Sequence, residues 1–228
     1  MKTKLLFILL MASLSCLSQD RNWVVSFNPT NLYINQANVG LEFNEGKNSI
    51  MLNVGIPWNK DAIGKLGISG NDYSFNKLGT EAVRVAYRHY AGKPLNGFYY
   101  EGYLKEQTIR ADFVTQNPST GILKGWLYST SAGFQLGYQF LFWKRLTLDI
   151  YPVGLEAGII SGRINGSAKT NGDALKLAEF VQDKINSDLP GYMKQNWHLD
   201  QYDNIVQGRL SNSGFPAFRS GVSIGIIF

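Results

Sequence analysis

Two histidines carry most of the catalytic chemistry that this sequence offers. His89 lies in an alternating segment, and His198 lies in a long polar stretch that also holds Ser211 and Ser213. A serine hydrolase needs a serine, a histidine and an orienting partner that meet in space. His198 with Ser211 or Ser213 could be drawn that way, but any serine-rich stretch allows such a pairing. We therefore predict that the chain is not an enzyme and keep a lipid hydrolase as the alternative.

Nucleotide and metal sites are not indicated either. The glycine-rich stretch "GKLGISG" at 64–70 lacks the residue order of a phosphate-binding loop. Metal binding needs clustered ligands, and two separated histidines do not supply a cluster. Cys16 is the only cysteine, so we expect neither a disulfide framework nor a cysteine metal site. We predict no catalytic, cofactor-binding or metal-binding residues.

Eight charged residues, with equal numbers of each sign, lie on segments in which every second residue is apolar. Four are acidic and four are basic: Glu42, Glu101, Asp149, Glu156, Arg84, Arg88, Lys105 and Arg219. Burying one of them without a partner would cost on the order of several kcal/mol. We therefore expect a network of ion pairs and hydrogen bonds that fills an interior. A proton or ion path along the same residues is the alternative.

The alternation predicts β-strands, in which successive side chains point to opposite faces. It recurs in eight segments, at 22–34, 38–44, 48–58, 80–91, 97–107, 131–143, 145–160 and 218–228. In the segment 131–143, the residues of one face are all apolar: Phe134, Leu136, Tyr138, Phe140 and Phe142. The opposite face holds mainly glycine and glutamine. The alternation changes phase at Tyr151–Pro152. This predicts a bulge, because proline cannot donate to the strand ladder.

The connections between these segments are short and long in turn. The short ones lie near Asn44–Lys47, Ala91–Asn96 and Trp143–Arg145, and the long ones span 57–79, 114–122 and 162–213. Only a tight turn expected near Asn35–Gln36 departs from the pattern. An even number of strands, with short turns at one end and long loops at the other, is typical of bacterial outer-membrane barrels.

The first eighteen residues have the layout of a secretory signal peptide. Two lysines precede an apolar run over 5–14, which is shorter than the roughly 20 residues of a spanning helix. We expect cleavage after Ser18 and one barrel domain over 19–228, with a lipidated Cys16 as the alternative. The formal charge of +5 falls to +3 once these lysines are removed, so we expect no nucleic-acid partner.

The composition favours a barrel, since 24 glycines accompany 13 Phe, 12 Tyr and 5 Trp in short alternating segments. If the charged face met water, eight strands would have to enclose about five large side chains from 131–143 alone, more than their lumen holds. We therefore expect the apolar face to meet lipid and the charged face to fill the lumen. The alternative is a secreted or periplasmic ligand-binding barrel of the lipocalin type.

Two stretches carry a resemblance. Terminal Phe228 resembles the C-terminal aromatic that the barrel-assembly machinery recognises in outer-membrane proteins. The mature chain resembles the small eight-stranded OmpA/OmpX-type barrels. The stretch "SFNPTNLYINQANVGLEF" at 26–43, with the short hairpin after it, is similar to an uncharacterised Bacteroidota outer-membrane family. The resemblance implies export through the periplasm and insertion among the outer-membrane lipids of a Gram-negative bacterium.

The last long connection predicts a helix. Leu177, Val181 and Ile185 recur every four residues, Asp173 is placed to cap the first turn, and Pro190–Gly191 is placed to end the helix.

Aromatic and polar residues follow this helix. Trp197, His198 and Tyr202 are candidate contacts for an extracellular ligand or protein, because loops on rigid scaffolds carry binding. We predict an all-β fold: an eight-stranded antiparallel up-and-down transmembrane β-barrel with one short helix in the last extracellular loop. Its function would be structural or surface-binding, through the loops at 57–79 and 162–213.

Overall fold

The computed structural model describes residues 23–34, 36–58, 69–70, 73–115, 121–188 and 191–228. The predicted signal peptide, its cleavage site and Cys16 lie outside these residues. Within the described residues, the ten strands are β1 (Trp23–Asn28), β2 (Gln36–Glu45), β3 (Asn48–Pro57), β4 (Ser69–Gly70), β5 (Tyr73–Tyr90), β6 (Gly97–Thr115), β7 (Gly121–Phe142), β8 (Leu146–Ser167), β9 (Trp197–Tyr202) and β10 (Ile205–Ile227). The helical elements are the 3-10 helix η1 (Pro29–Ile34), α2 (Asn171–Asp188) and α3 (Gly191–Lys194).

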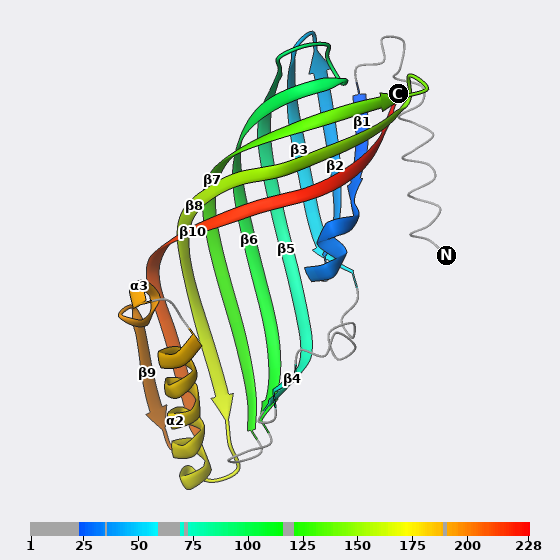
Figure 1. The fold of residues 1–228 in the computed structure, drawn as a ribbon. Helices are drawn as coiled ribbons and strands as arrows, with labels where there is room; N and C mark the ends of the chain where they lie inside the picture. The colour runs from blue at the N-terminus through cyan, green and yellow to red at the C-terminus, as the bar shows by residue number, and fades with distance from the viewer. Residues whose placement is uncertain (1–22, 35, 59–68, 71–72, 116–120, 189–190) are drawn as a thin grey trace, which may run out of the picture.

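Eight of the strands form a closed antiparallel ring, called the ring below, in the order β1, β2, β3, β5, β6, β7, β8 and β10. Pairing of β10 with β1, from Val24↔Ile227 to Phe27↔Ile224, closes it. The strands run up and down side by side (Figure 1). The predicted eight-stranded up-and-down antiparallel arrangement is confirmed. The short strands β4 and β9 lie outside the ring, paired with β5 and β10.

Away from the bulges, side chains alternate between the two faces of the ring. In β3, Met51 and Asn53 are buried, whereas Ile50 and Leu52 between them are exposed. The buried side chains point inward, because the ring has no other covered face. Within the described residues, no helix combines the length and the apolar character needed to cross a membrane.

Tyrosine rings inside the ring lie against glycines of neighbouring strands. A Cβ atom added at Gly133 would meet Cζ of Tyr103 at 2.2 Å, and one added at Gly137 would meet the hydroxyl of Tyr99 at 2.3 Å. These glycines leave room that any side chain would fill, so the interior is crowded by large residues opposite small ones.

The bulge predicted at Tyr151–Pro152 is present. The register of β8 shifts against both neighbours there, between Leu136 and Tyr138 on β7 and between Arg219 and Gly221 on β10. Because two residues of β8 then face one on a partner, the apolar set after Pro152 stays on the outer face although its parity in the sequence changes.

The three short connections are confirmed, and they lie at one end of the ring. The β2–β3 turn holds Gly46 at φ +61°, where glycine has no steric penalty. The three-residue β7–β8 turn holds Trp143 and Lys144 at φ 49° and 58°, and the Arg145 N–H donates to the Phe142 carbonyl at 3.0 Å. The tight turn expected near Asn35–Gln36 falls partly outside the described residues; η1 ends at Ile34 and β2 begins at Gln36.

The predicted loops over 57–79 and 162–213 are wrong in large part, because strands run through them. β5 begins at Tyr73, β8 continues to Ser167 and β10 begins at Ile205. Beyond the ring, residues 73–81, 108–115, 121–128, 161–167 and 205–212 continue as an open sheet to which β9 adds a strand. This part, called the extension, projects away from the end with the short turns (Figure 1).

Helix α2 covers the inner face of the extension. Its Leu177, Val181 and Ile185 are buried as predicted, in one cluster with Leu123 and Val206 of the sheet. The predicted cap is wrong. The side-chain oxygen of Thr170 accepts the backbone N–H of Asp173 at 3.2 Å, and its hydroxyl donates to the Asp173 carboxylate at 2.8 Å. Thr170 is therefore the N-cap, and Asp173 lies in the first turn of the helix. α2 ends at Asp188, just before the predicted stop at Pro190–Gly191; residues 189–190 lie outside the described residues, and Gly191 begins α3.

Candidate functional site

Arg88 on β5 is the centre of a charge network inside the ring. Its Nη2 lies 2.8 Å from Oε2 of Glu101 and 2.8 Å from Oδ2 of Asp149, and its Nη1 lies 3.7 Å from Oε2 of Glu42. The guanidinium also lies 3.8 Å from the centroid of the Tyr99 ring. All these side chains are buried. One cation therefore joins three carboxylates from three other strands.

The surrounding polar groups satisfy the remaining lone pairs of these carboxylates. Arg84 donates to Oε1 of Glu101 at 2.6 Å, and Tyr99 donates to Oδ1 of Asp149 at 2.6 Å. Ser49 donates to Oε1 of Glu42 at 2.6 Å. Such hydrogen bonds are needed because an ion pair inside a protein offsets its desolvation only when the other lone pairs are also bonded.

A tyrosine links two sides of the network. The Tyr90 hydroxyl lies 2.9 Å from Oε1 of Glu42 and also contacts Oε1 of Gln139 on β7. Nη1 of Arg88 donates to the same hydroxyl at 3.3 Å. Tyr90 and Gln139 are not among the predicted site residues, although both follow the inward alternation of their strands. That alternation was the signal that could have found them.

Glu156 on β8 is the centre of a second cluster, closer to the extension. Lys105 Nζ lies 2.5 Å from its Oε1, Ser131 donates to the same oxygen at 2.7 Å, and Tyr103 donates to Oε2 at 3.0 Å. The four groups come from β6, β7 and β8. Together the two clusters bring seven of the eight predicted charges into ion pairs.

Arg219 is the eighth predicted charge and behaves differently. Its guanidinium carbon lies 5.3 Å from the centroid of the Tyr103 ring and 5.2 Å from that of the Tyr151 ring. It makes no ion pair within the described residues. Arginine stacked on aromatic faces gains cation–π stabilisation instead. Because Arg84 also lies 5.2 Å from the Tyr103 ring, this ring lies near two cations.

The interior holds little free space at this level. The cavity lined by Glu42, Arg84, Gln139 and Tyr151 measures about 10 Å³, which is the volume of about one water probe. The site is thus a packed and electrically balanced plug of four acids and four bases. It can hold the eight strands in register, and the cavity that these residues line is too small for a substrate.

Among the described residues, neither histidine forms a hydrogen bond with a serine. His89 shares a contact of 2.8 Å with Oδ1 of Asn48 and lies 5.0 Å from the Tyr100 ring, on the outer face. In the described part of the chain, His198 makes no hydrogen bond to Ser211 or Ser213. Ser213 is buried and accepts Nδ2 of Asn196 at 3.2 Å. The geometry of a catalytic triad is not formed by these groups.

The three predicted contact residues lie on β9 rather than on a loop. His198 and Tyr202 are exposed. Trp197 is partly buried, since its ring packs on the α2 cluster. Trp197 therefore contributes to the core of the extension, and His198 and Tyr202 remain available for contacts. Terminal Phe228 donates its backbone N–H to the carbonyl of Trp23 at 2.9 Å, and its assembly role stays a prediction.

A family model described as "Protein of unknown function (DUF3575)" matches residues 5–158. No curated protein and no solved structure matches the chain. The match ends within β8, so α2, β9 and β10 lie outside it. Because the matched residues make up more than half of the chain, the protein belongs to the DUF3575 family of proteins of unknown function.

Proposed function

We propose that the protein is an integral outer-membrane β-barrel with a lumen filled by side chains, and that its extension serves contacts at the cell surface. One observation carries the proposal. The outer face of the closed ring is apolar and exposed, while the inner face is charged and buried. This is the reverse of a water-soluble barrel and fits one whose outer face meets lipid.

The exposed apolar residues come from strands all around the ring. They include Val39, Ile50, Leu52, Val54, Val83, Val85, Leu104, Phe134, Leu136, Phe140, Val153, Leu155, Ile224 and Ile226. Soluble monomers rarely expose a continuous apolar patch larger than a few hundred Å². A closed ring also leaves no strand edge unpaired, which hydrocarbon would not tolerate.

Aromatic residues flank this apolar belt at both ends. Tyr87, Tyr100 and Tyr138 are exposed toward the short turns, and Trp126 and Tyr128 are exposed where the extension begins. Rings that carry one polar group prefer the boundary between lipid and water, and girdles of this kind border the apolar band of outer-membrane barrels. The two rows support an orientation with the ring axis across the bilayer.

The interior supports a structural rather than a transport role. A ring of eight strands has room for side chains but not for an aqueous channel. Here the paired charges and stacked tyrosines occupy that room. The same polar interior argues against the ligand-binding alternative, since a lipocalin-type barrel needs an apolar pocket inside.

The first experiment is fractionation followed by gel electrophoresis of unboiled and boiled membrane extract in SDS. A closed barrel in the membrane fraction should migrate faster when unboiled, because it resists the detergent. A soluble periplasmic band without this shift would contradict the proposal.

A pair of arginine substitutions tests which face meets lipid. Leu104 on β6 is 67% exposed in the middle of the apolar belt, and Leu175 on α2 is 53% exposed outside it. Leu104→Arg should destabilise the barrel by about 2–4 kcal/mol if this face lies near the bilayer midplane. Leu175→Arg should change stability by less than about 0.5 kcal/mol, as surface substitutions usually do. Equal effects would mean that the outer face of the ring meets water.

A further inference from the structure

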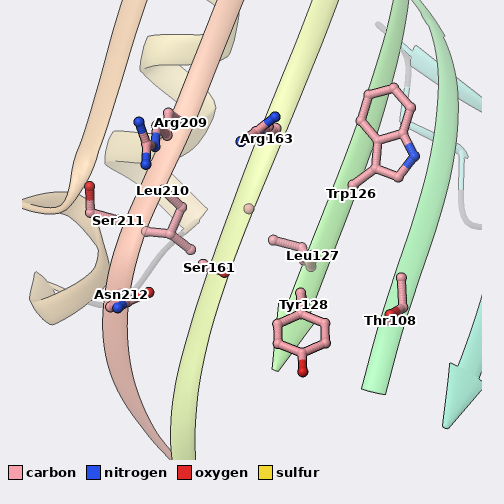
Figure 2. A pocket seen from close by; sticks show the side chains of 11 residues that line it. Thr108, Trp126, Leu127, Tyr128, Ser161, Arg163, Arg209, Leu210, Ser211 and Asn212 are labelled. Carbon is pink, nitrogen blue, oxygen red and sulfur yellow. The ribbon is translucent and has the colours of Figure 1, made fainter. Parts of the chain in front are cut away.

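A hollow on the outer face of the extension is lined by side chains that donate hydrogen bonds, together with Leu127, Gly162 and Leu210. It measures about 390 Å³ and lies over β6, β7, β8 and β10, between the aromatic residues Trp126 and Tyr128 and the basic residues Arg163 and Arg209 (Figure 2). Ser161 also lines it. No carboxylate belongs to its lining among the described residues. Asp200 lines an adjoining hollow together with the two arginines.

The strand register brings cationic residues of the hollow into one row. Arg163 lies directly opposite Trp126 of β7 and directly opposite Arg209 of β10, and Arg209 lies opposite His198 of β9. Residues opposite each other in a ladder point to the same face, with Cα atoms about 4.5–5.5 Å apart. Figure 2 shows Trp126, Arg163 and Arg209 at one level on three neighbouring strands.

Two arginines directly opposite each other are unfavourable unless an anion lies between them. Both side chains are exposed, and within the described residues neither makes an ion pair. The next arginine in the row, Arg110 of β6, lies opposite Trp126 and is already paired with Glu81 at 3.2 Å. Arg163 and Arg209 therefore keep their charge available for a ligand.

A bulge in β10 adds polar groups to the hollow. The register of β10 against β8 shifts between Leu210 and Ser213, so Ser211 and Asn212 together face one residue of β8. Both line the hollow. Bulges re-aim side chains and are common beside functional sites. The hydroxyl and amide groups can donate to an oxyanion whose charge the two guanidinium groups neutralise, a geometry that arginine provides for phosphate.

We propose that this hollow binds the phosphate of an outer-leaflet lipid headgroup. The inference rests on the proposed function, because it requires the ring to span the membrane. The outward residues of β8 run from Ile159, which is exposed, through Ser161 to Arg163. Arg163 is thus about 13 Å along the strand beyond the apolar belt, and less along the membrane normal because barrel strands are tilted.

The groups around Arg163 and Arg209 favour a lipid over a free anion as the ligand. Trp126 and Tyr128 belong to the aromatic row at the end of the apolar belt, so a molecule in the hollow touches both apolar and cationic groups. A free phosphate would use only the donors. A lipid headgroup uses the donors and also continues into the layer that the belt occupies.

The test uses the folded full-length chain in micelles and the temperature at which the fast-migrating unboiled band disappears. Lipid A, a phosphorylated glycolipid, is the probe, with dephosphorylated lipid A and inorganic phosphate as the other arms. Lipid A should raise the transition temperature, because a ligand that binds only the folded state stabilises it. Dephosphorylated lipid A and inorganic phosphate at the same concentration should not.

A matched pair of double variants tests whether lipid A binds at this hollow. Arg163→Gln with Arg209→Gln should bind lipid A at least about tenfold more weakly, since charge-assisted hydrogen bonds to phosphate are lost. Lys47→Gln with Arg145→Gln removes two exposed basic residues at the short-turn end and should leave the response unchanged. The single variants Arg163→Gln and Arg209→Gln should give intermediate responses and cover the case in which the double variant does not fold.

The outcomes separate the two proposals. A fast-migrating wild-type band whose response to lipid A is the same in both double variants overturns the lipid site alone. An equal response to inorganic phosphate at the same concentration makes the hollow a general anion site and overturns the lipid assignment. A wild-type chain that never gives a heat-modifiable band contradicts the outer-membrane proposal itself.

Discussion

Arg88 and Glu101 lie directly opposite each other on β5 and β6, and two nitrogens of the guanidinium, Nε at 2.9 Å and Nη2 at 2.8 Å, contact the same carboxylate oxygen, Oε2. Both side chains are almost completely buried. Arg88 also contacts Asp149 across the ring, so it links β5 to β8, two strands that are not neighbours. Buried ion pairs therefore stabilise the ring in addition to the hydrogen bonds between its strands.

Replacing Arg88 should be strongly destabilising. Arg88→Met would leave Glu42, Glu101 and Asp149 without their shared cation, and removing one partner of a buried ion pair costs about 3–5 kcal/mol. The free energy of unfolding, measured by urea titration in micelles, should fall by that amount. Arg145→Met in an exposed turn is the control and should have little effect. Similar results for both variants would mean that Arg88 is not the centre of the network.

The Lys105–Glu156 pair should show strong energetic coupling. Lys105→Met and Glu156→Gln each leave one charge unpaired inside the ring, whereas the double variant leaves none. A double-mutant cycle should therefore give a coupling of about 1–3 kcal/mol. The exposed pair Arg110–Glu81, with side chains 57% and 45% exposed, is the matched cycle and should give less than about 1 kcal/mol. Equal couplings would place Lys105 and Glu156 in water.

Gly133 should not tolerate a methyl group. Gly133→Ala would drive a Cβ atom into the Tyr103 ring, and such overpacking costs about 1–3 kcal/mol. Gly102 on the adjacent strand has open space on its side-chain side, so Gly102→Ala should change the unfolding free energy by less than about 0.5 kcal/mol. Urea titration of both variants checks this. The expectation fails if Gly102→Ala is the more damaging substitution.

Helix α2 should be able to detach while the ring stays folded. Leu177 is fully buried against the extension, whereas Leu175 two residues earlier is exposed. Leu177→Ala should lower the local stability of α2 by about 2–5 kcal/mol, seen as faster hydrogen exchange at Val181 and Ile185, while the unboiled band keeps its mobility. Leu175→Ala should leave exchange unchanged. Loss of the fast-migrating band in Leu177→Ala would show that helix and ring unfold together.

Much of the ring could be predicted from the sequence because strand alternation is a local property. Period two places Arg84 and Arg88 on the same face of β5 and Glu101 and Lys105 on the same face of β6 without knowledge of their neighbours. The phase change at Pro152 is equally local, since it follows from the missing proline N–H.

The extension was missed because its signal is weaker. In 205–212, Val206, Gly208 and Leu210 face inward between polar and charged residues, so the inner face has only two large apolar side chains. Without α2 to cover them, these residues have the sequence pattern of an exposed loop. Tertiary packing of the helix makes them buried, and the sequence around them does not show that packing.

By itself, the sequence determined which face of each strand is charged and where the strand phase slips, because both depend on neighbouring residues alone. The tertiary structure decided which partners meet: Arg88 with Asp149, 61 residues apart, and Arg163 with Arg209, across β8 and β10. These contacts depend on strand register and on ring closure. Both depend on all the strand pairings between distant segments together, and no local sequence pattern determines those pairings.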